Sequence, residues 1–140
     1  MKIRGYKNSD YSSVKLILKQ SDLYDEIWDS EENLKGMIDK NPESILVTED
    51  NTKLIAVIYL ISFGSKVSFI FRLAVKKEYR NKGIATKLVE FAKDVLSKKG
   101  VSEVGLFADA NNKQLYRFYN KRSFQTSNKH WIYLWKKLSQ

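Results

Sequence analysis

Three runs of aliphatic and β-branched residues between positions 44 and 75 constrain the fold of this chain most. They read SILVTED, KLIAVIYLISF and KVSFIFRLAV, and the turns between them are short, one around DNTK and one around Gly64 and Ser65. Residues of this kind favour β-strands, and short polar or glycine-containing connections favour hairpins. We therefore expect three consecutive strands that form the antiparallel middle of a sheet.

An amphipathic helix follows the third strand, from about Ile84 to Lys98. Apolar residues recur on one face at the spacing of helical turns, and charged residues occupy most of the other face. Lys98, Lys99 and Gly100 then form a conventional helix C-terminus. The apolar face consists of Ala85, Leu88, Val89, Ala92, Val95 and Leu96.

The rest of the chain alternates helices and strands without a linker-like stretch. The expected elements are strands at 2–6, 103–108 and 130–138, and helices at 11–19, 31–40 and 111–121. The sequence thus predicts the α/β class, as a single domain over residues 1–140. We expect a mixed central β-sheet with antiparallel N-terminal strands, flanked by helices and turning parallel after the third hairpin strand.

Composition excludes several kinds of site. The chain has no cysteine, so disulfides, thiolate metal ligands and a cysteine nucleophile are excluded, and a single histidine, His130, cannot form a multi-histidine metal site. We therefore expect no metal. No apolar run approaches the roughly 20 residues of a membrane span, and the first residues lack the apolar core of a signal peptide. We expect a cytoplasmic protein that does not enter the membrane.

The charge is unevenly distributed. A net charge of +9 and a pI near 9.6 favour a polyanionic partner, such as nucleic acid, anionic lipid or a phosphorylated small molecule. Acidic residues nevertheless gather in DLYDEIWDSEE, residues 22–32, which contains neither lysine nor arginine. This segment is either an ordinary solvated loop and helix start or a negatively charged site.

The turn KKEYRNKG, between the strand that ends at Val75 and the next helix, is equipped to hold an anion. The first amides of a helix lack acceptors and carry the positive end of its dipole. Gly83 allows a ligand to approach the backbone closely. Lysines and an arginine surround it: Lys76, Lys77, Arg80, Lys82 and Lys87. The turn matches neither a P-loop nor a G-x-G-x-x-G motif, so no nucleotide-binding motif supports the anion site. By itself, the turn fits an anion site and an ordinary helix start equally well.

Asn112 and Tyr119 in NKQLYRFYNKRSF lie seven residues apart, which places them on nearly the same side of a helix. Leu115 and Phe118 can then pack inward. A tyrosine at such a position is more often a core residue than a catalytic one.

Together, the two segments resemble the GNAT superfamily of acyl-CoA-dependent N-acyltransferases. Its cofactor loop reads R/Q-x-x-G-x-G/A, which Arg80 to Ala85 match, and its second motif reads roughly N-x-x-A-x-x-F/L-Y-x-K-x-G-F, which Asn112 to Phe124 follow. The spacing of the motifs and the order of the elements agree as well, so the resemblance covers essentially the whole chain. It implies a GNAT-like fold and acetyl-CoA as cosubstrate, with the turn holding the pyrophosphate.

The resemblance also implies roles by position. Main-chain groups of the strand that ends at Val75 would bind the pantetheine arm, and one of its amides would stabilise the oxyanion. Tyr119 would protonate the departing thiolate while a neutral primary amine attacks the thioester, without a covalent enzyme intermediate. The implied cofactor-binding residues are Leu73, Ala74, Val75, Arg80, Asn81, Lys82, Gly83, Ile84, Ala85, Thr86 and Asn112.

The resemblance leaves the base and the acceptor open. Many relatives carry a carboxylate on the strand that reads SFIFRL here, where this chain has Arg72. Glu26 and Asp29 are the preferred substitutes, with Asp109 and His130 as alternatives. The acceptor pocket is expected around Tyr24, Glu26, Trp28 and Asp29, with Trp131 as a further candidate.

Three residues depart from the family pattern: Lys77 replaces a proline, Leu115 a small residue and Ser123 a glycine. The serine strains the turn before Phe124 if that position needs a positive φ. None of the three removes a group that catalysis needs.

Two other functions stay open. One is a non-catalytic sensor that binds acyl-CoA on the same fold, and the other is a basic nucleic-acid-binding domain, which the net charge alone supports. The acceptor is a small molecule or a protein amine, and the sequence identifies neither it nor the acyl length. Family members often dimerise through their C-terminal strands, so the resemblance allows a homodimer through HWIYLWKKL, residues 130–138.

Overall fold

The computed structural model describes residues 1–129 and 131–139, which form two compact units, Met1–Leu106 and Phe107–Gln140. The first unit contains β1 (Lys2–Gly5), η1 (Asn8–Asp10), α1 (Tyr11–Gln20), α2 (Glu31–Lys40), β2 (Ile45–Asp50), β3 (Lys53–Phe63), β4 (Val67–Val75), η2 (Lys77–Tyr79), α3 (Ile84–Lys98) and β5 (Glu103–Gly105). The second unit contains α4 (Lys113–Asn120).

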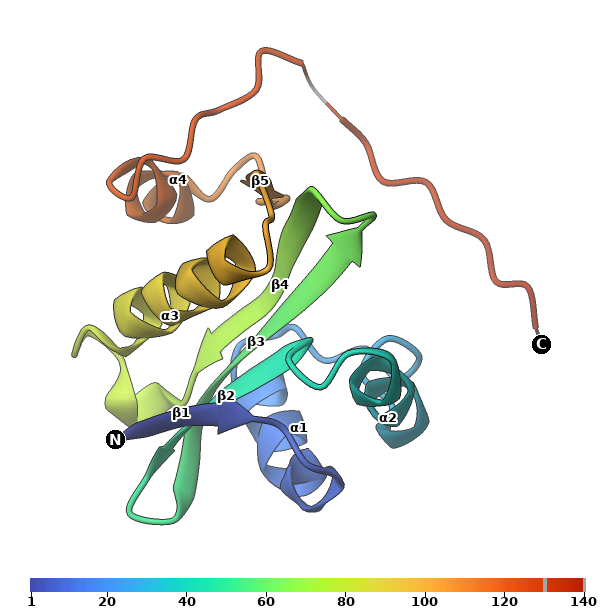
Figure 1. Ribbon diagram of the computed structural model, residues 1–140, viewed down its shortest axis with the longest axis vertical. Coiled ribbons are helices and arrows are strands. Elements are labelled where there is room, and N and C mark those ends of the chain that lie inside the picture. Colours follow the sequence, from blue (N-terminus) through green and yellow to red (C-terminus); the bar gives the residue numbers. More distant parts are fainter. Residues whose placement is uncertain (130, 140) are drawn as a thin grey trace. The chain divides into compact units, whose positions relative to one another are not determined.

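The first unit is built on one five-stranded sheet in the order β1-β2-β3-β4-β5 (Figure 1). Neighbouring strands are antiparallel from β1 to β4, and β5 pairs parallel to β4. The prediction of an antiparallel middle that turns parallel after the third hairpin strand is therefore confirmed. Helix α3 makes the crossover between the two parallel strands, which a parallel connection requires.

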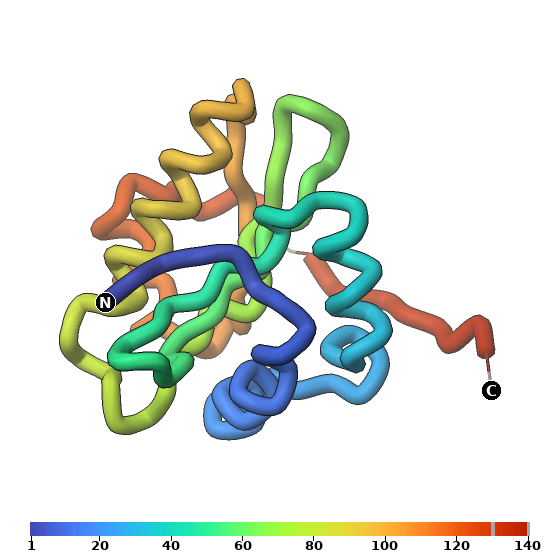
Figure 2. Tube along the Cα trace, turned by 60° about the horizontal axis from the view of Figure 1, so that its bottom comes forward, coloured from blue at the N-terminus to red at the C-terminus, as the bar shows by residue number. Residues whose placement is uncertain are grey.

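Both faces of this sheet are covered. Strand β3 is buried continuously from Leu54 to Leu60, as expected for a strand with helices on both sides. Figures 1 and 2 show α1 and α2 on one face and α3 on the other. The cluster on the α1 and α2 face includes Val14, Ile17, Leu18, Leu34, Val47, Val57 and Tyr59, and α3 buries Ile84, Leu88, Val89, Ala92 and Leu96.

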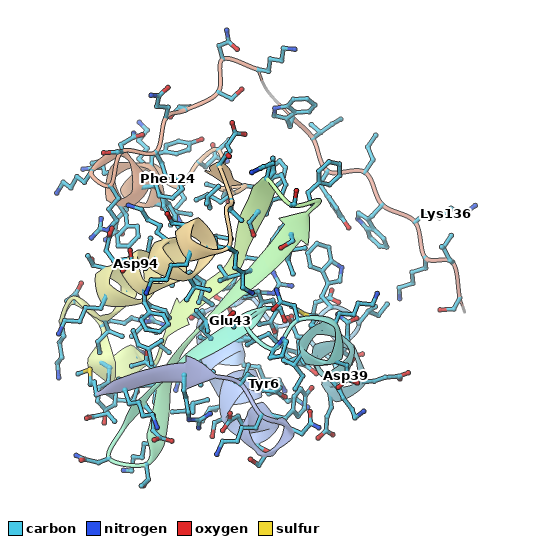
Figure 3. The ribbon with its side chains drawn as sticks, viewed as in Figure 1. Tyr6, Asp39, Glu43, Asp94, Phe124 and Lys136 are labelled. Atoms are coloured by element: carbon cyan, nitrogen blue, oxygen red, sulfur yellow. The ribbon has the colours of Figure 1, made fainter. Side chains whose placement is uncertain are left out.

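An ion pair ties β1 to the start of α1. The Arg4 guanidinium forms two hydrogen bonds with the Asp10 carboxylate, at 2.8 and 3.0 Å, and the Lys7 amide donates to the same carboxylate at 2.9 Å. Burial by itself raises the pKa of Asp10, but the hydrogen bonds and charges of Arg4 and Lys7 outweigh it and hold the pKa below its ordinary value. Tyr6 lies beside this corner, in the buried cluster under α1 (Figure 3).

Two expected strands differ from the structure. The strand expected at 103–108 ends at Gly105, because its ladder with β4 ends there. The strand expected at 130–138 is absent from its described part, residues 131–139, where both alternating sets of side chains are exposed and Lys136 projects into solvent (Figure 3). An alternating pattern predicts which side chains share a face, but a strand also needs a hydrogen-bonding partner. The expectation of a homodimer through this segment stays a prediction.

The second unit confirms the helix expected at 111–121, with α4 beginning at Lys113 and ending at Asn120. Ser123, which stands where the family motif has glycine, adopts a φ of 67°. The amides of Ser123 and Phe124 donate to the carbonyls of Asn120 and Tyr119, both at 3.1 Å, and so close the end of the helix. The strain expected at this serine is thus present.

None of the described helices has the length and apolar character needed to cross a bilayer.

Asp10→Asn tests the corner between β1 and α1. At neutral pH we expect the free energy of unfolding to fall by about 1.5–3 kcal/mol, because the substitution removes charge-assisted hydrogen bonds. A carboxylate with a lowered folded pKa stabilises above its unfolded pKa, near 4, and this stabilisation is lost as pH falls through the folded value. Urea unfolding should therefore show the difference at pH 7 and lose it below the folded pKa. Asp39→Asn, on the exposed Lys35–Asp39 pair, is the matched control and should change little; a pH-independent difference for Asp10→Asn would contradict the assignment.

Candidate functional site

A bulge interrupts the ladder between β3 and β4. The register shifts between Val57 and Tyr59, so that Arg72 and Leu73 together lie opposite Ile58. Arg72 has a φ of 56°, in the left-handed region where a bulge of this kind usually places glycine. A residue with a side chain adopts this conformation at a cost of roughly 1–2 kcal/mol.

On its other edge, β4 parts from β5. Pairing between the two strands ends at Phe69 and Gly105, and β4 continues to Val75 with no other strand of the first unit on that side. The Lys76 amide donates to the Ile55 carbonyl at 2.7 Å, so these two residues form a hydrogen-bonded pair across β3 and β4. Hydrogen-bonding direction alternates along a strand, so the N–H and C=O groups of Val75 point to the open edge.

The turn after β4 is fastened to its surroundings by Arg80. Its Nε donates to the Val75 carbonyl at 3.0 Å, and its terminal nitrogen donates to the Ser21 hydroxyl at 3.2 Å. The Lys77 amide donates to the side-chain oxygen of Gln20 at 3.1 Å. Arg80 thus holds the turn against the end of β4 and the end of α1, rather than pointing freely into solvent.

The turn delivers the chain to the start of α3 through two residues of positive φ, Asn81 at 62° and Gly83 at 78°. The first hydrogen bond of the helix runs from the Lys87 amide to the Gly83 carbonyl, 3.1 Å. The amides of Ile84 and Ala85 precede it and have no acceptor within the helix. A Cβ added at Gly83 would meet nothing within 4 Å, so the space before the helix is open to a ligand.

Beside the bulge, a buried carboxylate joins the acidic segment to the sheet. Asp29 is completely buried, with 0% of its surface exposed. The Arg72 Nε lies 3.1 Å from both of its carboxylate oxygens, the Tyr59 hydroxyl donates to Oδ1 at 2.8 Å, and the Asp25 amide donates to Oδ2 at 2.8 Å. Burial and the charge of Asp29 raise the pKa of the Tyr59 hydroxyl, so that it remains a donor.

An aromatic side chain covers the same arginine. The guanidinium carbon of Arg72 lies 5.1 Å from the centroid of the Trp28 ring, and the Phe71 ring meets Trp28 edge-on at 6.3 Å. Trp28 remains 40% exposed. The surface beside the bulge is therefore aromatic, and the positive charge of Arg72 behind it is balanced by Asp29.

The four residues expected to form the acceptor pocket lie in one segment but face different ways. The Tyr24 hydroxyl is 3.0 Å from that of Tyr11, whereas Glu26 and Trp28 are exposed and Asp29 is buried. The alternative bases are placed elsewhere: the Asp109 side chain accepts from the Asn111 amide at 2.9 Å in the second unit, and His130 lies outside the described residues. Trp131 is exposed.

In the second unit, the side chain of Asn112 caps α4, accepting from the Leu115 amide at 3.0 Å. Tyr119 is buried, and its ring contacts those of Phe118 and Phe124 edge-on at centroid distances of 5.0 and 5.2 Å. Burial raises the pKa of Tyr119 to about 12, and the nearby charge of Arg122 opposes this only in part. The phenol is therefore protonated throughout the neutral range.

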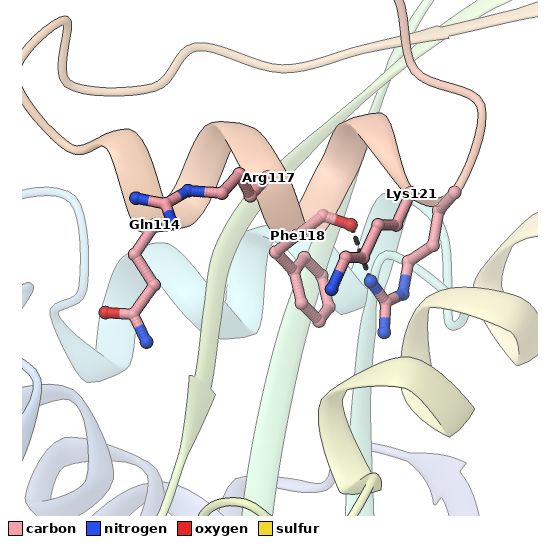
Figure 4. Close-up of a pocket in the computed structure, with 5 residues that line it drawn as sticks. Gln114, Arg117, Phe118 and Lys121 are labelled. Atoms are coloured by element: carbon pink, nitrogen blue, oxygen red, sulfur yellow. Dashed lines mark hydrogen bonds between the residues drawn. The ribbon is translucent and has the colours of Figure 1, made fainter.

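An open pocket of about 490 Å³ lies along α4 (Figure 4). Gln114, Arg117, Phe118, Lys121 and Arg122 line it. The guanidinium carbon of Arg122 lies 3.6 Å from the Phe118 ring centroid, and the Arg122 side chain also donates to the Phe118 carbonyl, so this arginine folds back onto α4.

The sequence pointed to the turn, the strand and the acidic segment, but it missed the connection of Asp29 to Tyr59 and Arg72. These residues are 30 and 43 positions apart from Asp29 along the chain. The only signal was the arginine at a position where many relatives carry a carboxylate. Among the described residues, no three His, Cys, Asp or Glu side chains gather into a group able to hold a metal ion.

Comparison with known proteins agrees with this architecture. Two solved structures share the fold at TM-scores of 0.80: Ard1 from Thermoplasma volcanium, 21% identical and covering 90% of this chain and 83% of that one, and PaiA N-acetyltransferase from Thermoplasma acidophilum in complex with coenzyme A, 22% identical and covering 92% of both. At these identities, the likeness shows the fold alone.

Sequence comparison extends the agreement. N-alpha-acetyltransferase 30 from Schizosaccharomyces pombe (strain 972 / ATCC 24843) is 33% identical over 87 residues, and the match spans 59% of this chain and 58% of that relative. An acetyltransferase from Yersinia pestis (strain Pestoides F) is 25% identical over 90% of this chain and 89% of its own length. The profile of the acetyltransferase (GNAT) family matches residues 11–124. The chain therefore belongs to the GNAT family of acetyltransferases.

Proposed function

We propose that this chain transfers an acetyl group from acetyl-CoA to a primary amine by direct attack, in the cytoplasm. The path of β4 carries the proposal: the strand parts from β5 after Phe69, bulges at Arg72 and leads through Gly83 to the start of α3. An open strand edge followed by helix amides suits a ligand with an amide-bearing arm and a pyrophosphate, which is the chemistry of coenzyme A. Family membership supports the same assignment.

The proposed contacts follow this path. Main-chain groups of β4 at Leu73, Ala74 and Val75 would bind the pantetheine arm, and the side chain of Asn112 would do so through Nδ2, since its oxygen caps α4. Backbone amides in the turn and first helical turn would bind the pyrophosphate. These belong to Arg80, Asn81, Lys82, Gly83, Ile84, Ala85 and Thr86.

In the reaction, the lone pair of the acceptor nitrogen forms the new C–N bond while the C–S bond breaks and its electron pair leaves on sulfur. An amide of β4 stabilises the charge that develops on the carbonyl oxygen. Tyr119 donates its proton to the departing sulfur. Burial raises the pKa of Tyr119 to about 12, so the phenol carries a proton to donate at neutral pH.

We propose a protein α-amine as the acceptor. An α-amine has a pKa near 8, against about 10.4 for a lysine side chain, so a larger fraction is already neutral at pH 7. That suits a site in which β4 offers Arg72 in place of a carboxylate and Asp29 is occupied by four hydrogen bonds. The name of the S. pombe relative supports the same class. Of the two preferred bases, Glu26 and Asp29, this leaves the exposed Glu26 as the candidate that accepts the amine proton.

Acetyl-CoA should bind at Gly83. At one hundred times its Kd, the ligand should stabilise the protein by about 2.7 kcal/mol and raise Tm by roughly 3–6 °C. Gly83→Ala should weaken this binding about tenfold or more, because it narrows the approach to the helix amides. Gly64→Ala is the matched control: Gly64 also has a positive φ, 68°, and open space around it, so both variants carry the same backbone strain. Equal binding by both variants would argue against the loop, and no shift with the wild type at millimolar acetyl-CoA would overturn the cosubstrate assignment.

Tyr119→Phe should lower kcat by roughly 10²- to 10⁴-fold, the usual contribution of a general acid, without changing the Kd for acetyl-CoA. The ring contacts survive this substitution, so stability should change little. With a pKa of about 12, Tyr119 keeps its proton as pH rises, and wild-type kcat should show no alkaline decline from this group up to pH 10.5. Tyr116→Phe, on the same helix, is the control and should keep its activity. If Tyr119→Phe remains fully active, the role of Tyr119 as general acid fails. If the wild type and Tyr119→Phe both bind acetyl-CoA and neither turns it over, the chain is a sensor.

Glu26→Lys should raise KM for a peptide with a free α-amine several-fold and leave KM for acetyl-CoA unchanged, since it reverses a charge beside the proposed acceptor surface. Glu32→Lys makes the same charge change on the exposed start of α2 and serves as the control. Steady-state kinetics with both substrates varied checks this expectation, and equal acceptor KM values in the two variants would remove Glu26 from the site.

A further inference from the structure

We propose that Asp29 is a positioning residue that holds Arg72 in the bulge of β4 and thereby aims the Leu73 amide at the thioester oxygen. The inference rests on the proposed function and deepens it. It assigns the buried aspartate a part in oxyanion stabilisation, in place of the role of base that the sequence suggested for it.

The contacts leave Asp29 no capacity to act as a base. It is fully buried, and its two oxygens accept hydrogen bonds from the side chains of Arg72 and Tyr59 and from the Asp25 amide. A terminal nitrogen of Arg72 also lies 3.1 Å from Oδ2. The Arg72 side chain is itself only 14% exposed, so water competes little for this ion pair. Asp29 is therefore committed to Arg72.

The backbone of Arg72 needs such a partner. Its φ of 56° is strained for a residue with a side chain, and strained conformations persist only where the surroundings impose them. Asp29 binds the guanidinium through hydrogen bonds, and the guanidinium carbon lies over the Trp28 ring. Both come from the segment between α1 and α2, so that segment holds the bulge in place from outside the strand.

Leu73 shares the bulge, opposite Ile58, and its N–H belongs to the peptide that joins it to Arg72. The orientation of that peptide therefore depends on the backbone conformation of Arg72. Two residues further along, Val75 presents its main chain to the open edge, and alternation along the strand gives Leu73 the same direction. Removing one oxyanion donor lowers kcat by about 10²- to 10³-fold. A rotation of the peptide between Arg72 and Leu73 would therefore lower kcat.

The first test is Asp29→Asn, which is nearly isosteric but neutral. We expect kcat with an α-amine peptide to fall at least tenfold at a temperature well below Tm, and the Kd for acetyl-CoA to change by less than threefold. Infrared spectra of bound acetyl-CoA labelled with ¹³C at the carbonyl should show a hydrogen-bonded, lowered C=O stretch in the wild type, and this lowering should be reduced in the variant. The spectrum is recorded without an acceptor amine, so it reports directly on the hydrogen bond to the thioester carbonyl.

Arg72→Gly supplies the decisive comparison, because glycine adopts a positive φ without strain. With glycine at position 72, the bulge no longer needs Asp29, so Arg72→Gly combined with Asp29→Asn should recover most of the kcat and the carbonyl shift that Asp29→Asn loses. A base lost at position 29 could not be recovered in this way. Asp10→Asn is the matched control, since it breaks another arginine–aspartate pair in the same unit and should leave kcat and the spectrum unchanged.

The outcomes separate the two proposals. If the wild type neither binds acetyl-CoA nor shifts its carbonyl band, the proposed function fails. If acetyl-CoA binds and Asp29→Asn keeps the wild-type kcat and carbonyl band, or if glycine at position 72 restores neither, the positioning role of Asp29 is wrong. Should Asp29→Asn not fold, Tyr59→Phe removes a single donor to Asp29, and a smaller loss of kcat with the same partial loss of carbonyl shift is expected; an unchanged carbonyl band would again overturn the role.

Discussion

The buried carboxylate of Asp29 and the left-handed backbone of Arg72 depend on each other, and through them the segment between α1 and α2 contacts the sheet. A buried carboxylate destabilises the fold unless an opposite charge lies close to it and its oxygens accept hydrogen bonds. Arg72 supplies the charge, and the Tyr59 hydroxyl and the Asp25 amide supply further hydrogen bonds. In return, the ion pair holds a strand conformation that an arginine would otherwise avoid. The segment between α1 and α2 is thereby fixed to the middle of the sheet.

The two halves of strand β4 differ in their pairing. Its first half pairs on both sides, with β3 and with β5, whereas its second half pairs only with β3. The bulge lies where the second half begins, and the strand then ends at a turn that Arg80 fastens through Val75 and Ser21. An open edge of backbone donors thus leads directly to the helix amides behind Gly83. This continuity is what the proposed binding of a long, flexible anionic ligand rests on.

Sequence reasoning succeeded where the signal was local. The β-branched runs predicted β2, β3 and β4, the apolar stripe predicted α3, and Ser123 was expected to be strained if its turn needed a positive φ, which it does. It failed where the outcome depended on a partner. The segment 131–139 alternates like a strand but has no ladder, and β5 ends where β4 departs from it. Asp29 appeared in sequence as one acid among several, and nothing nearby in the chain distinguished it from Glu26.

The sequence by itself determined the α/β order of elements, the position of the glycine-containing turn before α3 and the family, because turn chemistry and hydrophobic periodicity act over a few residues. Only the tertiary structure decided which acid is buried, which strand edge is open and which arginine is strained. Those outcomes depend on contacts between residues 30 to 43 positions apart, such as Tyr59 and Arg72 with Asp29. The free energy of burying a charge is set by the groups that meet around it, and a linear pattern does not contain that information.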